Sequence, residues 1–206
     1  LPGQEMDFAM KGNPWNVPRG FPGSHSLDLL HQSLDVFLKT GILRSPTFDK
    51  SLRDGKGDRS GWCELKSKIL ILEGWFVGCE PVSNLNNIDS LSEDKFNLSL
   101  SQDEKDYRSL IQESLIKYSK IWKKFDKIWH LKSSHFNNTI LWKTQQEEEM
   151  IKIRGSGLKG NNLTDFIRMI QSSIPQQSLS FINADTTVQI NQHRRIDKLL
   201  TTKYHF

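Results

Sequence analysis

Apolar side chains recur every three or four residues between positions 105 and 132, which is the period of an amphipathic helix. Ser101 and Glu104 form a capping box immediately before this stretch, so the helix is expected to begin there. Residues 129–132 can also form a short strand. We expect the apolar stripe to be the buried side of the helix; it consists of Tyr107, Ile111, Leu115, Tyr118, Trp122, Phe125 and Trp129.

Shorter patterns on both sides of this helix predict alternating helices and strands. Leucines between Leu27 and Leu38 mark a helix that ends at Gly41, because glycine readily takes the left-handed conformation of a C-cap. The aliphatic run 69–72, followed by Glu73, is typical of a central strand in a parallel sheet. This alternation predicts an α/β layer fold. Further helices are expected over 137–152, over 164–171 and after Pro175, and a last strand over 187–190.

Polar segments separate these elements within one expected domain, residues 1–206. Residues 46–61 are dense in Asp, Gly, Lys and Arg and are interpreted as a loop. Residues 83–100 are rich in Ser and Asn, which predicts a surface insertion. Gly155 begins a flexible break that extends to residue 162.

Composition narrows the class of protein. The chain has 206 residues, of which 36% are hydrophobic and 25% charged, as in a foldable globular domain. No apolar stretch is long enough to cross a bilayer, and residues 1–20 lack the pattern of a secretory signal. Cys63 and Cys79 match neither a C-x-x-C redox pair nor a zinc-binding pattern, so reduced thiols and a cytoplasmic location are expected, with no membrane partner.

The net charge of +4 does not indicate a nucleic-acid-binding protein. Lysines are concentrated on the predicted long helix, but they fall mostly off its apolar stripe, and arginines and aromatic residues are not displayed beside them. A solvated helix face explains them, and no nucleic-acid partner is expected. These residues are Lys117, Lys120, Lys123, Lys124 and Lys127.

Three segments could carry chemistry. A carboxylate at the end of a buried strand, such as Glu73, can hold Mg²⁺ or its water, although a strand followed by a turn would explain Glu73 equally well. Arg19 to His25 place a guanidinium, glycines, a hydroxyl and an imidazole ahead of a helix N-terminus, where an anion can bind. The loop 46–61, with its glycines among charges, could fold over such a ligand.

These segments together resemble the glycerate kinases of the phosphoribulokinase and uridine kinase group, within the P-loop NTPases. The blocks RGFPGSHS (19–26), FDKS (48–51), GKGDR (55–59) and LEGW (72–75) resemble motifs of that family in the same order. Downstream, Leu115, Tyr118 and Trp122 and the block WKTQQE (142–147) are similar to the family's L-x-x-Y-x-x-x-W and W-R-x-x-Q-E. Two positions depart from the family pattern: Ser26 replaces Asp, and Lys143 replaces Arg.

The resemblance implies a three-layer P-loop NTPase-like fold with a mostly parallel sheet. It also implies transfer of the γ-phosphoryl group of ATP, with Mg²⁺, to a hydroxyl of D-glycerate. In this interpretation residues 13–62 form the substrate loop, 69–73 a Walker B-like strand and 137–163 a helical lid. The implied substrate-binding residues are Arg19, His25 and Arg59 for the substrate carboxylate, Asp49 and Lys50 for positioning the substrate, and Asp58. The implied catalytic residues are Glu73, for Mg²⁺, and Lys143, for the lid.

The motif G-x-x-x-x-G-K-[ST], which cradles the phosphates of ATP, is absent from the sequence. We therefore expect the N-terminal P-loop unit and the catalytic aspartate to lie upstream of residue 1, and the flank of the strand at 69–72 to be open or filled unusually. Two alternatives stay open. The acceptor could be another hydroxylated molecule, such as uridine or pantothenate, or the chain could be a non-catalytic remnant that binds a small anion or a protein.

Overall fold

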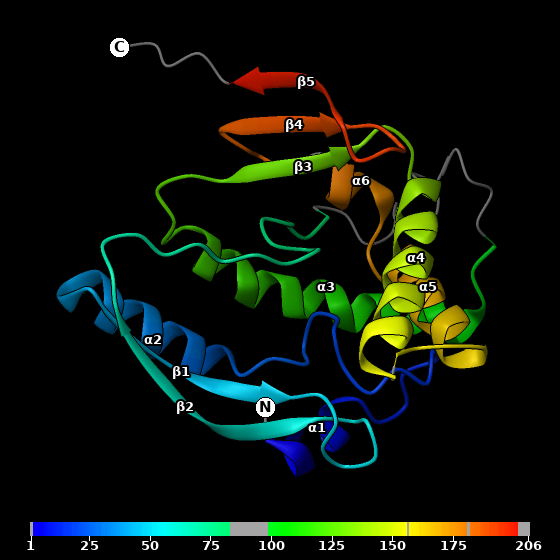
Figure 1. The fold of residues 1–206 in the computed structure, drawn as a ribbon, viewed down its shortest axis with the longest axis horizontal. Coiled ribbons are helices and arrows are strands. Elements are labelled where there is room, and N and C mark those ends of the chain that lie inside the picture. Colours follow the sequence, from blue (N-terminus) through cyan, green and yellow to red (C-terminus); the bar gives the residue numbers. More distant parts are fainter. Residues whose placement is uncertain (1, 83–98, 156, 181, 202–206) are drawn as a thin grey trace.

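A long central helix, α3 (Gln102–Trp122), organises the molecule, and the remaining elements pack around it (Figure 1). The computed structural model describes all residues except 1, 83–98, 156, 181 and 202–206. The predicted capping box is confirmed, because the Ser101 hydroxyl accepts from the Glu104 N–H and the Glu104 carboxylate accepts from the Ser101 N–H. The helix is shorter than its apolar pattern, and Trp129 belongs to a strand instead, where it is exposed.

The other elements do not alternate as expected but follow one another in short runs of helices or of strands, and the strands form two small sheets. β1 (Ile42–Asp49) and β2 (Asp58–Lys66) are an antiparallel pair, and β3 (Trp129–Ser133), β4 (Thr186–Ile190) and β5 (Ile196–Thr201) form a sheet in the order β3-β4-β5. β3 pairs with β4 in parallel and β5 with β4 antiparallel, so the expected mostly parallel sheet is wrong for the described residues. The helices are α1 (Gly3–Ala9), α2 (Leu27–Thr40), α4 (Asn137–Arg154), α5 (Asn161–Ser173) and α6 (Gln176–Ser180).

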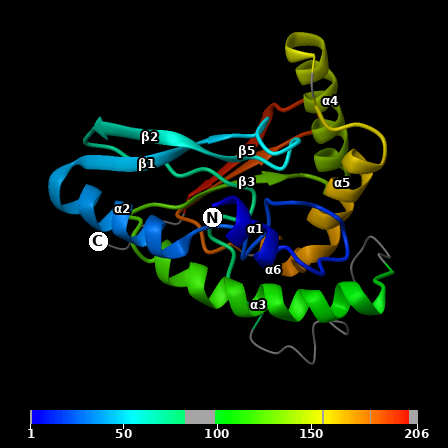
Figure 2. The same cartoon turned by 90° about the horizontal axis from the view of Figure 1, so that it is seen from below.

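Figures 1 and 2 show how these elements are arranged. The three-stranded sheet lies on one side of α3, and the β1–β2 hairpin with α2 lies on the other. α4 and α5 close one end, and the C-terminal part of α4 projects away from the body (Figure 2). The core gathers between α3, α5 and the segments 15–21 and 75–79, where Leu115, Ile121, Met169 and Ile174 are fully buried.

The aliphatic run 69–72 and the following Glu73 do not form the predicted Walker B-like strand 69–73. No strand of the described part of the chain pairs with it, and Ile69 and Ile71 are 74% and 85% exposed. Leu70 and Leu72 pack against the core, so the side chains alternate between inside and outside. A continuous apolar run predicts burial on both faces, and here one face is open. The expectation that the flank of a strand here would be open or filled unusually is not tested, because this segment forms no strand.

Two further predictions, one about a loop and one about the last strand, need correction. Residues 46–61 were expected to be a loop, but they form the second half of β1, the hairpin turn and the start of β2. The range 13–62, expected as the substrate loop, contains β1 and the start of β2 in addition to the helix predicted there, α2. The strand at β4 was expected to be the last, but β5 follows it after a turn at residues 191–195. The surface insertion predicted at 83–100 lies almost entirely outside the described residues.

The hairpin turn supports a specific prediction about stability. Gly57 has φ of +82°, and a Cβ there would lie within 2.6 Å of Phe48 Cζ and 3.2 Å of Arg19 Nη1. Gly55 has a similar φ of +86°, but a Cβ there would meet no atom within 4 Å. Because the backbone strain is shared, we expect Gly57→Ala to be less stable than Gly55→Ala by about 1 to 2 kcal/mol, from overpacking alone. Urea denaturation of both variants measures this difference, and equal midpoints would contradict the Phe48 contact.

A buried polar network joins α3, α5 and the N-terminal segment. The indole Nε1 of Trp15 donates to the Glu104 carboxylate at 3.0 Å and to the Ser172 hydroxyl at 2.6 Å. Arg168 donates to the same carboxylate from Nε at 2.6 Å, and Arg108 donates to the Ser172 carbonyl at 2.8 Å. Glu104, Arg108 and Ser172 are all nearly inaccessible to solvent. The network therefore fixes three segments that are distant in sequence.

Charges and cysteines agree with the expectations from the sequence. Lys117, Lys120, Lys123 and Lys127 are exposed, and the half-buried Lys124 pairs with Asp35 on α2. Cys63 and Cys79 are both free thiols, and burial raises the pKa of Cys79 to about 12.

Among the described residues, no helix combines the length and the apolar character that a membrane span requires.

Candidate functional site

The loop at residues 19–26 contacts both of the other segments that carry the resemblance. On one side, Trp75 Nε1 donates a hydrogen bond to the Gly20 carbonyl at 2.7 Å. On the other, Arg19 Nη1 donates to the carbonyl oxygens of Gly55, at 2.9 Å, and Lys56 in the hairpin turn. The Arg19 guanidinium also lies 5.6 Å from the centroid of the Phe48 ring. The fold therefore brings three distant motifs together, with the loop 19–26 between the other two.

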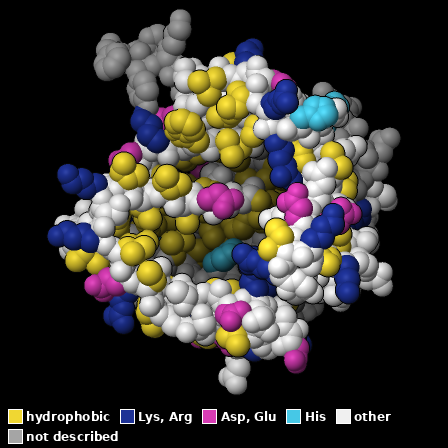
Figure 3. Space-filling view, viewed as in Figure 1, with side chains coloured by type: hydrophobic (Ala, Val, Ile, Leu, Met, Phe, Trp, Pro, Cys, Tyr) yellow, Lys and Arg dark blue, Asp and Glu magenta, His cyan; other side chains and the backbone are white. Residues whose placement is uncertain are grey.

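The face that carries the hairpin is hollowed. Figure 3 shows a depression between the three-stranded sheet and the β1–β2 hairpin, with hydrophobic side chains on its walls and charged side chains around it. Such a concave surface with a few polar groups is the usual form of a small-molecule site.

His25 is held in an unusual environment. The side chain is exposed, yet its Nδ1 lies 2.8 Å from the Tyr118 hydroxyl and its ring centroid 5.8 Å from that of Phe76. Solvent contact combined with close surrounding protein is expected for a side chain at the floor of a concave surface. Desolvation there lowers the pKa of His25 to about 4, so the ring is neutral at neutral pH. The predicted contact with a carboxylate would therefore be a hydrogen bond and not an ion pair.

The two acidic residues predicted to bind the substrate, Asp49 and Asp58, already form hydrogen bonds within the protein. Asp49 accepts from the N–H of Ser51 at 2.8 Å and from its hydroxyl at 2.6 Å, and these bonds lower the pKa of Asp49. Asp58 accepts from the N–H of Gly3 at 3.2 Å and faces Arg53 Nε at 3.9 Å, so it ties α1 to the hairpin. These contacts give both carboxylates a role in shaping the hairpin, and their part in substrate binding stays a prediction.

Lys143 on α4 pairs with Glu147, which lies one turn further along the helix. Its Nζ also lies 4.6 Å from the centroid of the Phe166 ring on α5. Glu147 is buried and accepts from the N–H of Leu158 at 2.7 Å. Burial alone would raise the pKa of Glu147, but the Lys143 ammonium, the Leu158 N–H and the nearby charge of Lys50 outweigh it and lower that pKa. The charge of Lys50 in the hairpin turn therefore acts on Glu147 of α4.

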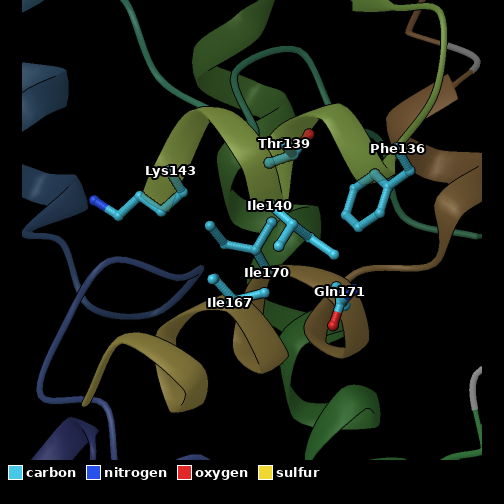
Figure 4. Close-up of a pocket in the computed structure, with 7 residues that line it drawn as sticks. All are labelled: Phe136, Thr139, Ile140, Lys143, Ile167, Ile170 and Gln171. Atoms are coloured by element: carbon cyan, nitrogen blue, oxygen red, sulfur yellow. The ribbon is translucent and has the colours of Figure 1, made fainter. Parts of the chain in front are cut away.

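A shallow depression between α4 and α5 lies beside this ion pair. Figure 4 shows Ile140, Ile167 and Ile170 pointing toward one another, while the Lys143 side chain extends away from them. The apolar contact anchors the base of Lys143 and leaves its ammonium on the side of Glu147.

Glu73 and Arg59, the remaining predicted site residues, are less constrained. Glu73 is exposed on the segment of chain that connects β2 to α3, and Arg59 is half-buried on β2. Among the described residues there is no group of three His, Cys, Asp or Glu side chains able to hold a metal ion. Mg²⁺ is usually bound through one or two carboxylates together with substrate phosphates, so the exposed Glu73 fits such an ion as a single protein ligand.

No protein-family model matches the chain. The chain is 26% identical over 196 residues to a protein of Saccharomyces cerevisiae named as a probable ATP-dependent kinase, TDA10. It is 27% identical over 190 residues to the kinase mug58 of Schizosaccharomyces pombe. The chain is a distant homologue of these fungal kinases. Both alignments include 88% of the chain but only 63% and 65% of the relatives, so the chain spans less than two thirds of their length.

Solved structures show the same fold. The D-glycerate 3-kinase of Cryptococcus neoformans var. grubii matches 98% of the chain with a TM-score of 0.81, and 76% of that protein is covered. The YGR205w protein matches the whole chain with a TM-score of 0.74, and 75% of it is covered. Sequence identities of 23% and 24% limit this likeness to the fold. The α/β architecture implied by the sequence resemblance is therefore that of a glycerate kinase, although the described sheets are small.

Two residues at the site were not singled out as functional from the sequence. Tyr118 was expected only as part of the buried stripe, and Glu147 only as part of a matched motif. Both motifs, L-x-x-Y-x-x-x-W and W-x-x-x-Q-E, contained these residues. A polar group inside an otherwise apolar stripe is the signal that could have drawn attention to Tyr118.

Proposed function

We propose that this chain provides the acceptor-binding and lid portions of an ATP-dependent small-molecule kinase, with D-glycerate as the acceptor. The observation that carries the proposal is the convergence of the three motifs through the Trp75–Gly20 and Arg19–Gly55 hydrogen bonds. Distant homology to fungal kinases and the fold shared with a D-glycerate 3-kinase support it. Uridine and pantothenate are the competing acceptors.

In this proposal the site residues divide into three tasks. Arg59 and Arg19 supply positive charge for the acceptor carboxylate, and the neutral His25 adds a hydrogen bond. Asp49, Lys50 and Asp58 hold the hairpin in the shape that receives the acceptor. Lys143 stabilises the charge that develops on the transferred phosphoryl group, since phosphoryl transfer is catalysed mainly by positioning and by electrostatic stabilisation.

ATP and Mg²⁺ complete the proposal. Bound Mg²⁺ would neutralise charge on the phosphates, with Glu73 as its protein ligand. The 206 residues contain no G-x-x-x-x-G-K-[ST] motif, so we propose that the phosphates of ATP are cradled by a segment outside them and that this chain alone is inactive.

A coupled ADP-release assay tests the proposal with D-glycerate, uridine and pantothenate as acceptors. It should be run on the 206-residue chain and on the longest protein that its reading frame encodes, with Arg59→Ala as the control in each. We expect the longer protein to phosphorylate D-glycerate and the shorter one to be inactive. A reading frame without a phosphate-binding motif would favour the non-catalytic alternative. Activity of the 206-residue chain alone would show that the missing motif is dispensable.

A further inference from the structure

Tyr118 places a hydroxyl group against the loop that precedes α2. The residue is 2% exposed, and its ring stacks on Trp122 at 5.7 Å and contacts Phe76 edge-on at 5.2 Å. The backbone N–H of Gly23 donates to the hydroxyl oxygen at 3.3 Å. The position of this hydroxyl is therefore fixed by packing, and its second neighbour is His25 Nδ1, at 2.8 Å.

The proton on the Tyr118 hydroxyl decides which nitrogen of His25 carries hydrogen. If Nδ1 were protonated, the hydroxyl oxygen would accept from both Gly23 and His25, and its own proton would have no acceptor among the described residues. Leaving a buried donor unpaired is unfavourable. When Tyr118 donates to Nδ1 instead, the hydroxyl proton and Nδ1 are paired with each other, and the ring proton resides on Nε2.

Ser24 does not change this assignment. Its hydroxyl lies 3.5 Å from His25 Nδ1, but it donates to the Phe21 carbonyl at 2.7 Å and accepts from the Gly20 N–H at 3.1 Å. On the other side of the ring, no described residue forms a hydrogen bond with Nε2, and the side chain is exposed.

We propose that Tyr118 is a positioning residue that holds His25 as the Nε2–H tautomer, so that the imidazole presents a neutral N–H donor to an oxygen of the bound acceptor. The acceptor class is a small hydroxylated carboxylate. This inference rests on the proposed function for the identity of the acceptor, whereas the tautomer depends only on the fold. A neutral donor binds an oxygen without the cost of desolvating a cation, and the carboxylate charge is left to the arginines.

Long-range ¹⁵N–¹H correlation spectra of the ¹⁵N-labelled 206-residue chain at pH 7 test the tautomer directly. We expect one neutral His25 ring with its proton on Nε2. In Tyr118→Phe the fixed donor is lost, and the spectrum should shift toward a mixture of tautomers. Tyr107→Phe is the matched control, because it removes a hydroxyl that donates to the Ala9 carbonyl and should leave His25 unchanged. A wild-type ring protonated on Nδ1, or on both nitrogens, would overturn the inference.

The acceptor contact is tested on the longest protein encoded by the reading frame. We expect Tyr118→Phe to raise the KM for D-glycerate about tenfold with little change in kcat, because the loss concerns a contact made equally in the ground state and the transition state. Addition of D-glycerate should also shift the His25 Nε2 resonance. An unchanged KM, despite the expected tautomer, would overturn the acceptor contact. A protein that phosphorylates only another acceptor would refute D-glycerate while the NMR result for Tyr118 stands.

Discussion

Glu104→Ala is expected to lower the free energy of unfolding by about 3 kcal/mol, because it removes a buried carboxylate that caps a helix and accepts several hydrogen bonds. The Glu104 side chain is 6% exposed, and it accepts from both Trp15 and Arg168. The same carboxylate closes the capping box at the start of α3. One substitution therefore removes a helix cap and the link between α3, α5 and the N-terminal segment.

The stability contributed by Glu104 should depend on pH. Burial alone would raise its pKa, but hydrogen bonds from Arg168, Ser101 and Trp15 outweigh burial and lower the pKa from 4.5 to about 2. Because the folded-state pKa is below the unfolded one, the contribution is fully present above about pH 5 and is lost as the pH falls toward 2. The stability gap between wild type and Glu104→Gln, which does not titrate, should therefore be largest at neutral pH and narrow in acid.

Urea denaturation of the two proteins between pH 3 and 7, followed by far-UV circular dichroism, measures this gap. Glu113→Gln is the matched control, because Glu113 is exposed on the same helix and should leave the midpoint unchanged at every pH. A gap that stays constant with pH would mean that the charge of Glu104 contributes nothing.

The helical part of the fold was predictable because the sequence signals of a helix lie within the helix and beside its ends. The cap at Ser101, the part of the stripe from Ile111 to Trp122 and the left-handed Gly41 after α2 depend on neighbouring residues, and each is confirmed. The strands depend on distant partners, which a local pattern cannot contain. The run 69–72 has the composition of a central strand but no pairing strand among the described residues, and β5, whose residues are all exposed, lacks any apolar alternation.

For the candidate site, the sequence was a better guide to the segments that form the site than to the contacts of each side chain. The three motifs do meet, but Arg19 binds backbone carbonyls and Asp58 ties α1 to the hairpin. The pKa of His25 is lowered, so its ring is neutral at neutral pH. Residue type alone could not show these states, because each depends on contacts between residues far apart in the chain. The assigned roles of Glu73, Lys50 and Arg59 stay predictions.

Lys143→Met is expected to lower kcat for phosphoryl transfer about 100- to 1,000-fold in the active protein, as loss of a group that stabilises transition-state charge does. Methionine preserves much of the side-chain length and the apolar contact with α5, so the variant removes the ammonium with little change in packing, and the Glu147 carboxylate keeps the Leu158 N–H as a partner. The charge is held beside Glu147, which also receives the Leu158 N–H, so Lys143 is already positioned before any ligand binds. KM for the acceptor should change much less than kcat.

Four variants separate this role from a structural one. Lys152→Met removes an exposed lysine near the end of the same helix and should leave kcat unchanged. Lys143→Arg retains the positive charge and should keep most of the activity. Glu147→Gln should lower kcat by about tenfold, because it leaves the ammonium present but less well held, whereas Glu148→Gln, its exposed neighbour, should have no effect. A Lys143→Met protein with normal kcat would exclude this lysine from the transition state and move the search for that cation to Lys50, the other lysine whose charge acts on Glu147.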